Sequence, residues 1–221
     1  MRFLVTFILL CSLPCAALAA KQTPLITEDQ LAKACKGTGC QLVALETPWP
    51  NNASDSSRQQ LKFGHFEFSI PPGASLRIVP IGAALVAKYE HGQKISIHYE
   101  YATQFQPDHI VKLYKKASIR IADYPSILFT KTPSDAEPRL IYDRWIWRDA
   151  MAGKGLIFNK TEATHVTRSG TVSVYYALTP SSDHESLAYV TDSSEPSSFM
   201  LVQLDGFTLG DLEKLIGSIR K

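Results

Sequence analysis

The 221-residue sequence has little excess charge of either sign. Its 23 lysines and arginines nearly balance its 21 aspartates and glutamates, which gives a formal net charge of +2 at pH 7. Such a chain has no overall field to attract nucleic acid or an anionic membrane surface. The one basic cluster, Lys112, Lys115 and Lys116, is typical of a solvated helix end. We therefore expect no nucleic-acid partner.

Motifs that carry common catalytic chemistry are also missing. The sequence has no Gly-x-Ser-x-Gly, His-Glu-x-x-His, Gly-x-x-x-x-Gly-Lys or Gly-x-Gly-x-x-Gly pattern. The run Ser181-Ser182-Asp183-His184-Glu185 holds reactive groups, but a catalytic triad joins residues that are distant in sequence, so we interpret the run as a solvated turn. His91, His98 and Glu100 could bind a metal ion only together with a further ligand, and the sequence shows no such set. We expect no metal or cofactor and favour a non-enzymatic protein.

A long apolar run occurs only at the N-terminus. Arg2 precedes apolar residues 3–10, and the small residues Ala17 and Ala19 follow, which is the order found in cleavable signal peptides. The run is short for a transmembrane helix, which needs about 20 residues. Pro14 argues against a lipid anchor at Cys15. We interpret residues 1–20 as a signal peptide and expect a periplasmic or secreted protein.

Cysteines are few, and only two of the four lie beyond the predicted signal peptide. Cys35 and Cys40 enclose the glycine-containing spacer Lys36-Gly37-Thr38-Gly39. In an exported protein, an even number of cysteines joined in this way predicts a disulfide. A metal or redox site would need a second Cys or His pair, or a Cys-x-x-Cys motif. We therefore predict a structural disulfide.

A polar, proline-containing segment at residues 47–57 divides the chain. Before it, Thr27 and Gln30 form a capping-box pattern that predicts a helix from Glu28 to about Cys35. We assign residues 21–59 to an N-terminal helix, a disulfide loop and a linker. Residues 60–221 then form the main domain.

Alternating apolar residues predict an α+β main domain. Phe66, Phe68 and Ile70 share one face of a strand, and residues 83–90 and 94–101 have the pattern of a hairpin. Helices are predicted from Pro107-Asp108 and after Thr208. Further strands are predicted at 75–79, 126–130, 155–158, 161–167, 171–178, 187–190 and 199–204. This order indicates a central antiparallel sheet flanked by helices, with a short disulfide-linked N-terminal helix.

Three segments of the main domain together resemble the Mog1/PsbP-like fold. They are the run from Phe66 to Gly73, the hairpin at 83–101 and the terminal stretch from Gly210 to Arg220. The resemblance covers about residues 60–221 and implies a central antiparallel sheet flanked by helices. It also implies a family whose members mostly bind other proteins. It brings no active-site motif to this sequence.

The segment Tyr142 to Arg148 has the most unusual local composition. As a strand it would place Trp145 and Trp147 on one face, whereas as a helix it would place Trp145 and Arg148 on one side. Tryptophan, tyrosine and arginine dominate protein-binding energies. The candidate partner-binding residues are therefore Tyr142, Arg144, Trp145, Trp147 and Arg148. Alternatively, the tryptophans fill the core and the arginines are solvated.

Three functional hypotheses follow from the sequence. The first is an exported, non-enzymatic domain that binds a protein partner, as a toxin inhibitor or an envelope-complex accessory protein does. The second is an exported hydrolase of unfamiliar type that uses His184 or His98 with nearby carboxylates. The third is a small-molecule or lipid carrier with an apolar cavity between sheet and helix. The missing catalytic motifs favour the first.

Overall fold

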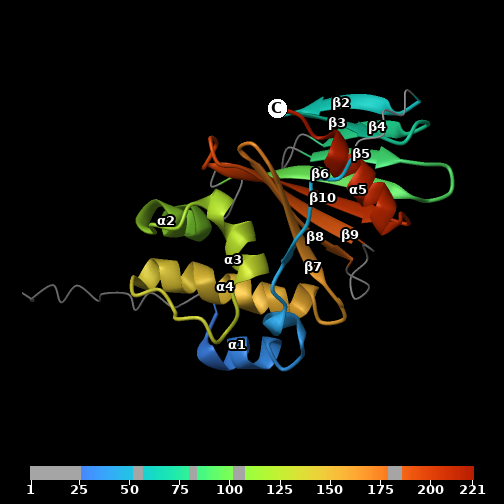
Figure 1. The fold of residues 1–221 in the computed structure, drawn as a ribbon. Helices are drawn as coiled ribbons and strands as arrows, with labels where there is room; N and C mark the ends of the chain where they lie inside the picture. The colour runs from blue at the N-terminus through green and yellow to red at the C-terminus, as the bar shows by residue number, and fades with distance from the viewer. Residues whose placement is uncertain (1–25, 52–56, 80–83, 102–107, 179–185) are drawn as a thin grey trace, which may run out of the picture.

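The fold was obtained as a computed structural model that describes residues 26–51, 57–79, 84–101, 108–178 and 186–221 (Figure 1). The strands are β1 Leu45–Glu46, β2 Gln59–Phe63, β3 Phe66–Ile70, β4 Ser75–Val79, β5 Ala84–Lys88, β6 Lys94–Tyr101, β7 Thr164–Ser169, β8 Val172–Leu178, β9 Ser186–Asp192 and β10 Ser198–Asp205. The helices are α1 Glu28–Ala34, α2 Asp108–Lys116, α3 Tyr124–Thr130, α4 Ile141–Ile157 and α5 Leu209–Ser218, with 3₁₀ turns η1 Gly39–Gln41 and η2 Ile121–Asp123.

Eight strands form one sheet in the order β1-β7-β8-β9-β10-β6-β5-β4, while β2 and β3 pair separately. Neighbouring strands are antiparallel except β1 and β7, which run parallel. The prediction of an α+β fold is confirmed. The predicted hairpin is also confirmed, since β5 and β6 pair with Ala84 opposite His98 and Lys88 opposite Lys94.

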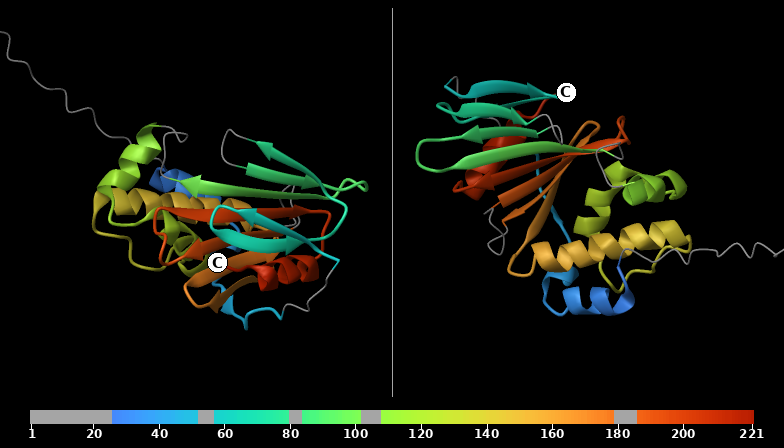
Figure 2. Two further views of the ribbon diagram at one scale, coloured as in Figure 1. Left: turned by 90° about the horizontal axis from the view of Figure 1, so that it is seen from above. Right: turned by 180° about the vertical axis from the view of Figure 1, so that it is seen from behind.

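Different elements cover the two faces of the sheet, with α5 and the β2-β3 pair on one side and α1, α3 and α4 on the other (Figures 1 and 2). Successive side chains of β8 point to opposite faces of the sheet, and apolar residues occur at both sets of positions. Val174 and Tyr176 belong to the core under α5, whereas Tyr175 and Ala177 belong to the core that α3 covers. The helix-covered sheet therefore separates two apolar layers.

The C-terminal helix α5 closes the first layer. Thr208 and Asp211 form a capping box at its start, as Thr208 predicts, and its apolar stripe is buried against the sheet. Burial of a leucine or isoleucine side chain contributes roughly 1.5–3 kcal/mol. Beyond the helix, the backbone of Arg220 pairs with Glu67 of β3 through N–H to O distances of 2.9 and 2.7 Å. The end of the chain is thus joined to β3.

The N-terminal segment is attached to α4 and to the sheet edge. The predicted helix and the Cys35–Cys40 disulfide are both confirmed. The two sulfur atoms lie 3.6 and 3.3 Å from the carbonyl oxygen of Met151 on α4. The chain then adds β1 beside β7, where Thr47 N–H donates to Val166 O at 2.9 Å. α1 and the disulfide loop therefore form the outermost layer on this side.

Two predicted strands are wrong. Residues 126–130 lie in α3, whose first turn holds Pro125 and which buries Leu128 and Phe129. Residues 155–158 continue α4 and its end. Both runs are rich in apolar residues that suit a strand, but packing between helix and sheet decides their conformation. Within the described ranges, no helix is long and apolar enough to cross a membrane.

Helix α4 also buries a lysine. Lys154 is 0% exposed, and its Nζ donates a 2.5 Å hydrogen bond to the carbonyl oxygen of Lys131. Burial disfavours the charged amine and lowers the pKa of Lys154 from 10.5 to about 8, against a smaller opposing effect of Asp135. The lysine therefore anchors the segment after α3 at a cost in charge desolvation.

This burial makes the stability of the fold dependent on pH. The unfolded lysine keeps its proton up to about pH 10.5, whereas the folded one loses it near pH 8, so unfolding takes up a proton between these values. We expect the free energy of unfolding to rise by about 2 kcal/mol from pH 7.5 to 9.5. Urea denaturation at several pH values measures this rise. The variant Lys154→Met should lack it, and an equal rise in that variant would contradict our assignment.

Candidate functional site

Helix α4 places the two tryptophans of the candidate segment on different sides. The segment is helical, which settles the open choice between strand and helix. Trp147 is 4% exposed and packs with Ala150 and Met151 against Leu31 of α1. A side chain so buried offers no surface to a partner. Trp147 is therefore removed from the candidate partner-binding residues, which leaves Tyr142, Arg144, Trp145 and Arg148.

Arg148 is also occupied within the molecule. Its guanidinium donates to both carboxylate oxygens of Glu137, at 2.9 and 3.0 Å, and to Glu28 of α1 at 2.9 Å. These carboxylates, Glu137 first, raise the pKa of the Arg148 guanidinium. The side chain is only 12% exposed. Arg148 therefore ties α1 and the segment before α4 together.

Tyr142 and Trp145 remain accessible at the beginning of α4. Their rings meet edge to face with centroids 5.4 Å apart. Lys116 of α2 donates a 3.3 Å hydrogen bond to the Tyr142 hydroxyl, and its Nζ lies 5.2 Å from the centre of that ring. This arrangement fixes the aromatic pair at the junction of α2 and α4.

Two aliphatic residues extend this surface. Leu140 and Ile141 are 59% and 53% exposed, although an apolar side chain gains free energy by leaving water. Arg144, one helical turn beyond Leu140, is 40% exposed, and its Nε donates to the carbonyl oxygen of Pro138 at 3.2 Å. We call this surface the α4 patch, and it comprises Leu140, Ile141, Tyr142, Arg144 and Trp145.

Positive charge borders the α4 patch. Lys116 contacts Tyr142, Arg139 precedes Leu140 in the chain, and both basic residues are exposed. The nearby carboxylates are engaged: Asp143 is 5% exposed and accepts hydrogen bonds from the Ser118 N–H at 2.7 Å and from its hydroxyl. Glu137 is bound to Arg148 and lies 3.5 Å from Arg144. The patch thus presents apolar and aromatic surface with a cationic rim.

The structure describes only some of the other residues that were weighed as candidate sites. Residues 1–20, with Cys15, and the run 181–185 lie outside the described residues. His91 is exposed in a turn, whereas His98 and Glu100 are half-buried on β6. In the part of the chain that the structure describes, no group of three or more His, Cys, Asp or Glu side chains could hold a metal ion.

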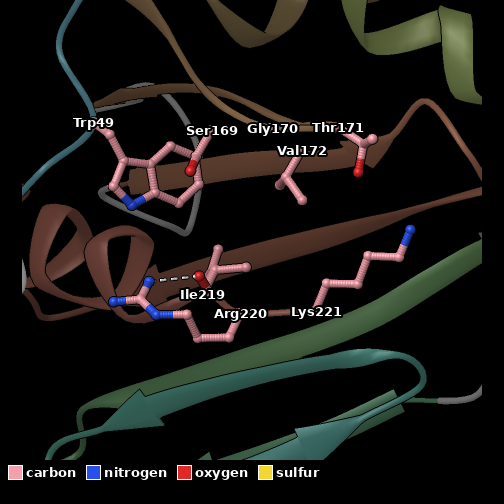
Figure 3. Close-up of a pocket in the computed structure, with 8 residues that line it drawn as sticks. All are labelled: Trp49, Ser169, Gly170, Thr171, Val172, Ile219, Arg220 and Lys221. Carbon is pink, nitrogen blue, oxygen red and sulfur yellow. Dashed lines mark hydrogen bonds between the residues drawn. The ribbon is translucent and has the colours of Figure 1, made fainter.

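A pocket of about 440 Å³ lies on the α5 side of the sheet (Figure 3). Its volume falls within the range of small-molecule sites. It is lined by Trp49, Ser169, Gly170, Thr171, Val172, Ile219, Arg220 and Lys221. Sequence reasoning missed it, because three distant segments form it and none of them carries a recognisable motif.

Comparison with known proteins gives no family assignment. No protein-family model matches the chain, and no curated protein matches it. The resemblance to the Mog1/PsbP-like fold stays a prediction. A functional conclusion must therefore rest on the geometry of the α4 patch and of the pocket.

Proposed function

We propose that the protein is an exported, non-enzymatic domain that binds an acidic protein partner through the α4 patch. The observation that carries this proposal is the exposure of Leu140 and Ile141 beside the Tyr142–Trp145 pair. Exposed apolar surface with a polar rim is typical of a protein interaction site. Removal of this surface from water would favour association by about 25 cal/mol per Å².

The composition and charge of the patch support the same proposal. Tryptophan, tyrosine and arginine are the residue types that most often dominate binding energy. The cationic rim favours an acidic partner, because complementary charge speeds encounter and excludes like-charged proteins. The Cys35–Cys40 disulfide supports export, since such bonds persist in oxidising compartments. Inhibition of a toxin and support of an envelope complex are the activities that this proposal includes.

The test compares substitutions at the two ends of α4. Leu156 at the end of α4 is 69% exposed but lies far from the patch, so Leu156→Ala is a matched control for Ile141→Ala combined with Trp145→Ala. Immobilised wild type and Leu156→Ala should both recover one acidic partner from an envelope extract. Binding of the purified partner to the double variant should weaken by about 2 kcal/mol or more, as for central aromatic contacts.

Salt dependence provides an independent readout of the charge argument. Affinity of the wild type should fall as ionic strength rises, because screening weakens attraction between exposed charges. Equal binding by the double variant and the wild type would contradict the α4 patch as the interface. Failure of the wild type to recover any partner would contradict the binding function itself.

A further inference from the structure

The pocket on the α5 side is independent of the α4 patch, because the two lie on opposite faces of the sheet. Its walls are held by main-chain contacts. Arg220 pairs with Glu67 of β3 as an isolated bridge, and Gly170 occupies the β7–β8 turn with a φ of +58°. Trp49 comes from the segment after β1 and packs against the core under α5. The concave surface is thus built from anchored segments.

The two cations at this pocket differ in what neutralises them. Lys221 Nζ lies 2.9 Å from Asp192, whose side chain is 1% exposed. Burial raises the pKa of the Asp192 carboxyl, but hydrogen bonds from Lys221, Ser194 and Thr171 outweigh burial and hold this pKa well below its usual range. Arg220 donates through Nη1 to the carbonyl oxygens of Gly217 at 2.9 Å and Ile219 at 2.8 Å. Among the described residues, no carboxylate forms an ion pair with Arg220. Arg220 therefore brings to the pocket a positive charge whose hydrogen bonds go to main-chain carbonyls at the end of α5.

The remaining lining combines an aromatic ring with hydroxyl groups. The Trp49 indole and the Arg220 guanidinium lie at the same end of the pocket, while Lys221 extends toward the other (Figure 3). Ser169 and Thr171 line the wall opposite the C-terminal segment; the Ser169 hydroxyl is turned toward the cavity (Figure 3), and the Thr171 hydroxyl is hydrogen-bonded to Asp192. A guanidinium suits a planar carboxylate, and an indole face suits a flat apolar group.

We infer that this pocket binds a carboxylate attached to an aromatic group, with Arg220 contacting the carboxylate and Trp49 the ring. The volume of about 440 Å³ accommodates one ring and a short acid. Such chemistry occurs in a free aromatic acid and at the C-terminus of a peptide that ends in an aromatic residue. Both sources share the two groups that the pocket recognises.

The first test uses three small probes on the full chain without residues 1–20. N-acetylphenylalanine carries both groups, its amide carries only the ring, and acetate carries only the charge. We expect N-acetylphenylalanine to bind saturably with a dissociation constant of about 1 mM or below and the other two at least tenfold more weakly. Amide NMR shifts of Gly170 and Val172 report binding at the pocket itself.

Two arginine variants separate the pocket from general charge. Arg220→Gln should weaken N-acetylphenylalanine binding about tenfold or more, because a charge-assisted hydrogen bond is lost. Arg168→Gln is the control, since Arg168 lies two residues from the turn glycine but does not line the pocket, and its side chain forms an ion pair with Glu46 of β1. Cooperative thermal unfolding should show that both variants are folded, although Arg220→Gln also loses the two hydrogen bonds to the end of α5.

Binding of a tetrapeptide that ends in phenylalanine distinguishes a peptide C-terminus from a free aromatic acid as the ligand. Tighter binding of its free acid than of N-acetylphenylalanine indicates a peptide terminus, and equal or weaker binding indicates a free acid. No saturable shift of Gly170 with any probe would overturn the inference. Equal binding of acid and amide by the wild type would also overturn it, whatever the variants do.

Discussion

Replacement of Trp147 by alanine should lower the free energy of unfolding by about 3–5 kcal/mol. The indole is 4% exposed between α1, α3 and α4, and truncation leaves a cavity that the surrounding helices cannot fill completely. Trp145 is half-buried and packs against Tyr142, so Trp145→Ala should lower the free energy of unfolding by about 1 kcal/mol or less. Equilibrium denaturation in guanidinium chloride measures both losses.

A third substitution distinguishes packing from hydrogen bonding at this position. Among the described residues, the Trp147 indole N–H has no hydrogen-bond partner, so Trp147→Phe removes an unsatisfied buried donor while it keeps an aromatic ring. We expect it to cost less than about 1.5 kcal/mol. Equal destabilisation by Trp145→Ala and Trp147→Ala would contradict the placement of one at the surface and the other in the core.

Elements with a strong local period could be predicted from the sequence. β3, the β5-β6 hairpin and α5 each place their apolar residues at the spacing of the element that forms, so local pattern and tertiary packing agree. The capping residues Thr27 and Thr208 likewise mark helix starts, because the cap hydrogen bonds involve only neighbouring residues. These predictions needed no information about distant contacts.

Elements whose conformation depends on distant contacts could not be predicted in this way. Residues 126–130 and 155–158 have the composition of strands, yet α3 packs on the sheet and α4 packs under α1 and the disulfide loop. The same contacts decide which tryptophan is buried. Trp147 faces Leu31 only because α1 is folded back onto α4.

The candidate sites, too, were only partly predictable from the sequence. The unusual composition of Tyr142 to Arg148 pointed to the helix that carries the α4 patch, but exposure of Leu140 and Ile141 became visible only in the fold. The pocket joins Trp49, the β7–β8 turn and the end of the chain, which are far apart in sequence. A single sequence holds no signal for such a junction.

Replacement of Gly155 by alanine should destabilise the protein by about 2–3 kcal/mol, although alanine is the better helix former. A Cβ at this position would lie 2.3 Å from the carbonyl oxygen of Ala34 and 2.8 Å from Cys40 Sγ. Neither a helix backbone nor a disulfide sulfur can move away cheaply. We expect α1 and the disulfide loop to separate from α4, and equilibrium denaturation measures the loss.

Gly153→Ala is the matched control, because it makes the same change two residues earlier in α4. Its Cβ would meet the Tyr124 hydroxyl at 3.4 Å and Leu128 at 3.9 Å, which are ordinary contacts. Lower entropy of the unfolded chain should then stabilise this variant by about 0.4–1 kcal/mol. If Gly155→Ala lowers the free energy of unfolding and Gly153→Ala raises it, the loss in Gly155→Ala comes from close packing of the N-terminal segment on α4. Stabilisation by both substitutions would mean that α1 does not pack on α4 at Gly155.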